Sequence, residues 1–159
     1  MTARRVIPLF PAPLAALAPA ARADACADWL AIGAAGLLAE TAAVNLLAEH
    51  GTWLSRDSFT SRCIDIAGDL GDVPGCTAAV IRWRAAVTGL HRHGATGSEK
   101  AVLQIAASIA AGLPVSLHDA LGSLDRPALR AVLRAVAHAN SGQCGHDLIT
   151  PARPQEPLF

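Results

Sequence analysis

Apolar residues recur along this chain at the three- and four-residue spacing of amphipathic helices. The first predicted helix runs from about Ala25 to Glu49, and Gly51 follows where a helix would end. Its apolar side carries Leu30, Leu37, Val44 and Leu47. Within it, Gly33 and Gly36 either weaken the helix locally or allow a neighbouring element to approach closely.

Two shorter helices and a loop are predicted in the middle of the chain. One helix covers 56–66, with Phe59, Cys63 and Ile66 on one side, and another covers 77–90, with Val80, Trp83, Val87 and Leu90. The glycine-rich segment 68–75 between them is a loop. We expect no strands, because no useful stretch alternates apolar and polar residues with a period of two.

Three further helices are predicted after residue 97. Ser98 is the expected N-cap of the first, which ends at Gly112, and Ser116 with Asp119 has the spacing of a capping box for a short second helix. Asp125 is the expected N-cap of the last. The last helix is expected to dock through the apolar stripe Leu129, Val132, Leu133, Val136 and Ala137.

The length of 159 residues suits one domain, and the composition is 52% hydrophobic but only 4% aromatic. We therefore predict an all-α fold, an orthogonal bundle of five or six helices over residues 24–142. Residues 1–23 and 143–159 contain most of the prolines and are expected to be disordered.

The leader has an alternative interpretation as a signal peptide, since Arg4 and Arg5 precede an apolar run and the Ala21-Arg22-Ala23 triplet resembles a cleavage site. Its prolines favour a disordered leader instead. The longest apolar run, 29–39, is too short to cross a membrane. The cysteines, Cys26, Cys63, Cys76 and Cys144, form no C-x-x-C pair, so thiols in a reducing cytoplasm are expected. If the chain were exported, Cys63 and Cys76 could form a bridge.

The formal net charge is zero, but the charge is distributed unevenly. Residues 24–75 carry two arginines and eight acids, a net −6, and residues 76–142 carry seven basic residues and three acids, a net +4. The i+4 spacing places Arg126, Arg130, Arg134 and His138 on one face of the last helix as a basic ridge. Our leading hypothesis is a cytoplasmic helical interaction or regulatory module that binds an unknown protein partner, or a second copy, through this ridge.

A second hypothesis is a DNA-binding regulator that uses residues 98–139, whose three predicted helices resemble a helix-turn-helix domain. Pro114 stiffens the turn and His118 replaces an apolar residue. The segment 116–121 carries no Arg, Lys, Asn or Gln to read base edges in the major groove.

Candidate metal ligands are few, and we predict no metal and no cofactor. His91 and His93 could combine with Cys144 and His146, but neither pair has the spacing of a zinc site. The acids around the glycine loop, Asp65, Asp69 and Asp72, do not match a calcium loop. An enzyme is the third hypothesis, without catalytic residues to name, because no catalytic motif is present.

Three segments together resemble small helical proteins of GC-rich actinomycetes: HGTWLSRDSF (50–59), SEKAVLQIAASIAAGLPVSLHDAL (98–121) and LDRPALRAVLRAVAHANSG (124–142). That family is uncharacterised and has no established function. The resemblance implies a folded intracellular domain and brings no catalytic residues with it.

Overall fold

A computed structural model describes residues 17–67 and 77–142. In chain order the elements are α1 (Pro19–Gly33), α2 (Leu38–His50), α3 (Thr52–Ser55), α4 (Asp57–Cys63), β1 (Ile64–Ala67), β2 (Ala78–Ile81), α5 (Trp83–Thr88), the 3-10 helix η2 (Leu90–His93), α6 (Gly97–Ala111), α7 (Leu117–Ser123) and α8 (Arg126–Ser141). The predicted all-α bundle is confirmed. The predictions for residues 1–16, 68–76 and 143–159 lie outside the described residues.

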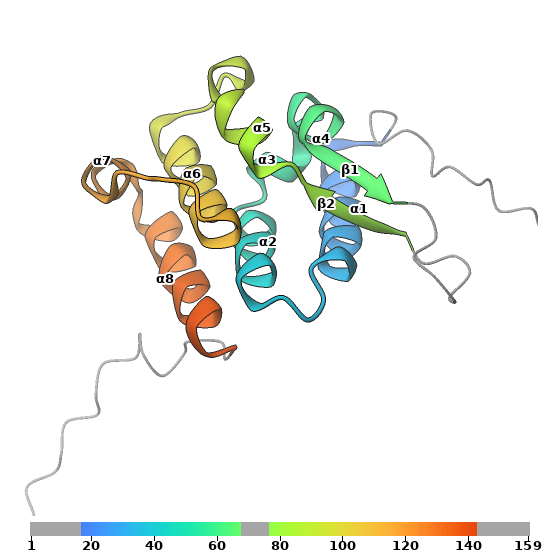
Figure 1. The fold of residues 1–159 in the computed structure, drawn as a ribbon. Helices are drawn as coiled ribbons and strands as arrows, with labels where there is room; N and C mark the ends of the chain where they lie inside the picture. The colour runs from blue at the N-terminus through green and yellow to red at the C-terminus, as the bar shows by residue number, and fades with distance from the viewer. Residues whose placement is uncertain (1–16, 68–76, 143–159) are drawn as a thin grey trace, which may run out of the picture.

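Helix α2 occupies the middle of the molecule. It packs against α1 and α3 on one side and against α6 and α8 on the other, and the β1–β2 hairpin crosses α1 and packs against it through β2 (Figure 1). The largest fully buried side chains come from several of these elements: Trp53, Phe59, Leu30, Leu46, Leu47, Leu54 and Leu103. The core is therefore built from a few large side chains set among many alanines.

The first predicted helix is in fact two helices. The chain leaves α1 after Gly33 and turns at Gly36, whose φ of 83° is strained for any residue with a Cβ, before α2 starts at Leu38. Leu37, expected on the buried side, is 59% exposed in this turn.

Helix α1 also begins earlier than predicted, at Pro19, so residues 19–23, which were expected to be disordered, are helical. The side chain of Arg22 is buried, and its guanidinium donates to the carbonyls of Ser55 (2.8 Å) and Leu17 (3.0 Å). The hydrogen bond to Ser55 ties the first turns of α1 to the end of α3.

The expectation of no strands is wrong for two short segments. Strands β1 and β2 form an antiparallel hairpin in which Ile64 pairs with Ile81 and Ile66 with Ala79. Each strand has four residues, too few for a period-two pattern to stand out in the sequence. The hairpin depends on tertiary packing of β2 against α1, where a Cβ on Gly33 would lie only 2.0 Å from the backbone oxygen of Ala79.

Most helix starts in the second half follow the sequence signals. Ser116 accepts from the backbone N–H of Asp119, and Asp125 accepts from that of Ala128 at 2.8 Å, as expected of N-caps. The N-cap of α6 is Thr96, not Ser98. Thr96 and Glu99 form a reciprocal capping box, which satisfies two backbone donors and therefore outcompetes the single bond that Ser98 could supply.

Helix α8 docks through a different face from the one predicted. Val132 and Ala137 are buried as expected, but Leu129, Leu133 and Val136 are 37%, 44% and 50% exposed. The buried side is made of small residues: Ala128, Ala131, Val132, Ala135 and Ala137. Small side chains let α8 approach the alanine-rich surface of α2 closely, since the distance between helix axes depends on the side chains at the contact.

Candidate functional site

The outer surface of α8 carries the four residues of the predicted basic ridge, and the structure divides them into two pairs. Arg126 and Arg130 are exposed and form no ion pair with any described residue. Arg134 pairs with Glu49 of α2, with Nε 3.2 Å from Oε2. His138 is half-buried beside α2.

Helical geometry explains this division. A step of four residues advances the direction of the side chain by about 40°, because a turn of helix takes 3.6 residues. From Arg126 to His138 the ridge therefore rotates by about 120° around α8. Its first half faces solvent and its second half reaches α2, so the arginines of the ridge without an ion pair to a described residue are Arg126 and Arg130.

The exposed side chains Leu129, Leu133 and Val136 form an apolar stripe beside these two arginines. Their spacing of four and three residues keeps them on one face of the helix. Folding does not bury them, because α8 contacts the bundle through its alanines. The outer surface of α8 thus combines two free cations with a row of large apolar groups, and we call these five residues the α8 surface.

A groove between α2 and α8 lies next to the α8 surface. It encloses about 220 Å³ and is lined by Ala42, Asn45, Leu46, Glu49, Ala131, Arg134, Ala135 and His138. Small-molecule sites usually enclose about 300–1,000 Å³. The groove is smaller, and its two charged residues already neutralise each other, so it does not have the character of a ligand site.

A larger but shallow depression lies beside α5. It encloses about 570 Å³ and is lined by Arg82, Trp83, Arg84, Ala85, Thr88 and Ala111. The indole nitrogen of Trp83 already donates to Glu40 at 2.8 Å, and Arg82 pairs with Asp65 at 3.3 Å. Two of the polar groups at this depression are therefore already paired within the protein.

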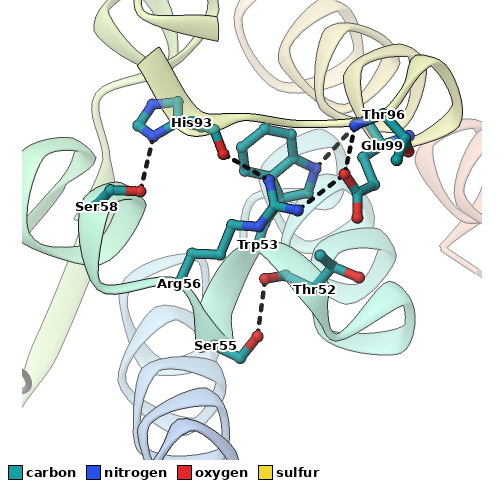
Figure 2. A network of polar contacts seen from close by, with 8 residues as sticks. All are labelled: Thr52, Trp53, Ser55, Arg56, Ser58, His93, Thr96 and Glu99. Atoms are coloured by element: carbon teal, nitrogen blue, oxygen red, sulfur yellow. Dashed lines mark hydrogen bonds and ion pairs between the residues drawn. The ribbon is translucent and has the colours of Figure 1, made fainter. Parts of the chain in front are cut away.

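A second cluster, which sequence reasoning missed, is a network of polar contacts around Trp53 (Figure 2). Arg56 donates to the Glu99 carboxylate at 2.9 Å and to the carbonyl of His93 at 3.1 Å. Trp53 donates through its indole nitrogen to the carbonyl of Glu99 at 2.9 Å. The network joins α3 and α4 to the start of α6, across more than forty residues of sequence; its one sequence signal was the T-x-x-E spacing of Thr96 and Glu99.

The surroundings of the network around Trp53 lower the pKa values of both Glu99 and His93. Burial of Glu99 would raise the pKa of its carboxyl, but hydrogen bonds from the Thr96 backbone and from Arg56 outweigh burial and hold the pKa below its usual range. Burial lowers the pKa of His93, and nearby cations, Arg56 first among them, lower it further. The lowered pKa favours the neutral form of the imidazole, which packs edge-on against Trp53 and Phe59.

Ser58 and His93 have the separation of a nucleophile and its base, 3.1 Å between Oγ and Nδ1. A catalytic pair also needs room for a substrate. Neither the α2–α8 groove nor the depression beside α5 includes these residues. The hydrogen bond orients the buried ring of His93 within its aromatic contacts, and the network links α3 and α4 to the start of α6.

The other candidate residues are described only in part. His91 is exposed while His93 is buried, and Cys144 and His146 lie outside the described residues, as do Asp69 and Asp72. Within residues 17–67 and 77–142, no three His, Cys, Asp or Glu side chains gather as metal ligands would. Cys26 and Cys63 are buried free thiols, and burial raises the pKa of Cys26 to about 11. The remaining two cysteines lie outside the described residues.

The three helices of the predicted helix-turn-helix are present as α6, α7 and α8. Helix α7, which would read DNA, exposes Leu117, His118 and Leu121 and carries no arginine or lysine. In the described part of the chain, no helix is long and apolar enough to cross a membrane.

Comparison with known proteins returns no relative for this chain. No family model, no curated protein and no solved structure matches it. The resemblance to small actinomycete proteins stays a prediction.

Proposed function

We propose that this protein is a cytoplasmic helical interaction module that binds a protein partner through the α8 surface. The observation that carries the proposal is the exposure of Leu129, Leu133 and Val136 beside Arg126 and Arg130. The partner surface that fits is an acidic helix with an apolar face.

The composition of the α8 surface supports this proposal. Protein interfaces have an apolar centre and a polar rim, and arginine is enriched in them relative to the rest of the surface. Three large apolar side chains in a row on one helix, with two unpaired arginines at their side, have this arrangement. The free buried thiols of Cys26 and Cys63 fit a reducing compartment.

The DNA-binding alternative has less support from the described residues. Phosphate contacts need clustered positive charge, and α7 supplies none, while Arg134 of α8 is already paired with Glu49. An enzyme has no site to name. Both hypotheses therefore rank below protein binding.

The direct test is affinity capture from the native host with three baits, followed by mass spectrometry. The first bait is the wild-type chain and the second is the double variant Arg126→Glu, Arg130→Glu. The third, a matched control with the same change in net charge, is Arg84→Glu, Arg92→Glu, since both of these arginines are exposed away from α8.

We expect wild type and control to retain the same partner at moderate salt and the α8 variant to lose it. Circular dichroism should show the same helix content for all three baits. Equal capture by the α8 variant would refute the proposal. Retention of random-sequence DNA that weakens steeply with salt and is lost in the α8 variant would favour the DNA-binding hypothesis instead.

A further inference from the structure

The outer face of α1 has the opposite charge to the α8 surface. Asp24 and Asp28 are exposed, four residues apart, and form no ion pair with any described residue. The rest of this face is small, with Ala31 exposed and Ile32 at its edge, 40% exposed, and the exposed Ala35 follows in the turn after the helix. Along α1, this outer face therefore has an acidic first half and a second half of small apolar side chains.

The α8 surface has a similar order with the sign reversed. Arg126 and Arg130 stand in its first half with Leu129 between them, and Leu133 and Val136 follow. Large side chains on α8 would thus meet small ones on α1, which allows two helices to lie close together.

We propose that the partner of the α8 surface is α1 of a second copy of this chain, so that copies associate head to tail. This inference rests on the proposed function, which makes the α8 surface a binding face, and it names the occupant. A formal net charge of zero is consistent with it, since a chain without net charge has little overall repulsion between copies.

The charges select one orientation of the two helices. In a parallel pairing with Arg126 opposite Asp24, the same register brings Arg130 opposite Asp28 and Leu133 opposite Ala31. An antiparallel pairing would put the arginines against the apolar end of α1 and the aspartates against leucines. Complementary charges at the flanks of paired helices set orientation and register in this way.

The fold determines the kind of assembly that results. Helices α1 and α8 lie on opposite sides of the molecule, with α2 between them (Figure 1). One copy cannot present both faces to the same neighbour, so the contact is heterologous and adds copies beyond two, as a chain or a closed ring.

The test is sedimentation velocity over a concentration series, at low salt (about 50 mM) and at high salt (about 500 mM), where screening shortens the Debye length. We expect the average mass of wild type to rise past that of a dimer at low salt and to fall at high salt. The variants Arg126→Glu, Arg130→Glu and Asp24→Arg, Asp28→Arg should each weaken association by roughly tenfold or more, because like charges then oppose each other. The control Arg84→Glu, Arg92→Glu should associate like wild type.

The decisive variant carries all four changes, Asp24→Arg, Asp28→Arg, Arg126→Glu and Arg130→Glu, in one chain. Its net charge equals that of wild type. Opposite charges again face each other across the contact, with the signs of α1 and α8 exchanged, so we expect this variant to associate as wild type does. The inference would be overturned if wild type stayed monomeric at every concentration or formed only dimers. It would also be overturned if the variant with all four substitutions did not regain association.

If wild type is monomeric while α8-dependent capture persists, the proposed function stands with another partner. If Arg126→Glu, Arg130→Glu changes neither capture nor association, both fail.

Discussion

Arg56 makes three contacts through its guanidinium group: with the carbonyl of His93, the carboxylate of Glu99 and the ring of Trp53, whose centre lies 5.1 Å away. The side chains of Arg56 and Glu99 are 23% and 16% exposed, so water screens the pair only in part. A partly buried acid that loses its cation keeps its desolvation cost and loses the compensating bonds.

We therefore expect Arg56→Met to lower the free energy of unfolding by roughly 1–3 kcal/mol, in urea titrations near neutral pH. Arg92→Met is the control, since Arg92 is exposed and should change stability by less than about 0.5 kcal/mol. Equal effects of the two substitutions would show that the network around Trp53 contributes little to stability.

Leu133 and Ala131 test which face of α8 meets the bundle. Leu133 is 44% exposed and Ala131 is 3% exposed at the contact with α2. Leu133→Ala should cost less than about 1 kcal/mol, since it leaves no enclosed cavity. Ala131→Leu should cost about 1–3 kcal/mol by forcing α8 away from α2. Thermal unfolding of both variants gives the comparison, and the reverse ranking would restore the face predicted from sequence.

Among the secondary-structure elements, the packing of α1 on strand β2 depends on the absence of a side chain at Gly33. An added Cβ would overlap the backbone oxygen of Ala79, and a backbone oxygen cannot rotate away. Gly33→Ala should therefore destabilise the fold by about 3 kcal/mol or more, the upper range for overpacking.

Gly97→Ala is the matched control in α6, because its Cβ would meet only the side chain of Ser123 at 3.7 Å. It should be neutral or gain up to about 1 kcal/mol by restricting the unfolded chain. Chemical denaturation measures both glycine variants. A Gly33→Ala variant as stable as its control would mean that α1 and β2 lie farther apart than described.

Elements with local signals could be predicted from the sequence, and those fixed by distant partners could not. The caps at Ser116 and Asp125 are readable because side chain and backbone bond within three residues. The docking face of α8 was predicted wrongly because leucine counts more than alanine in a pattern of hydrophobic residues. The close packing of α8 against the alanine-rich α2 instead requires small side chains at the contact. The pairing of Arg134 with Glu49 depends on the packing of α8 against α2. The i+4 spacing of basic residues within α8 contains no information about that packing.

Considered as a whole, the molecule is expected to be acid-labile. Burial lowers the pKa of His50, which Glu99 and Asp125 only partly offset and Arg56 reinforces, and burial likewise lowers that of His93. Unfolding restores an ordinary pKa of about 6.5, so the unfolded chain binds more protons below that pH. The contribution of the neutral histidines to stability is complete above about pH 6.5 and is lost as the pH falls from there through their lowered pKa values in the folded state. Glu99, whose pKa is also lowered, adds a further loss as the pH falls below 4.5.

Melting temperatures measured between about pH 8 and pH 5 should therefore decrease toward the acid end. His50→Gln should flatten this decrease, and His118→Gln is the control because His118 is exposed on α7. If the melting temperature were constant across this range, or if His50→Gln had the wild-type profile, His50 would not be a cause of the loss of stability in acid.

The pairing of α2 with α8 also bears on how fast the chain folds. Glu49 and Arg134 are 85 residues apart in sequence, so the two helices meet only after most of the chain has been brought together. The loss of chain entropy precedes the contacts that compensate for it, and folding slows as the sequence separation of contacts grows. During synthesis, α2 can bury the surface that contacts α8 only after α8 has left the ribosome. This bundle should therefore fold more slowly than one whose helices pair with their nearest neighbours.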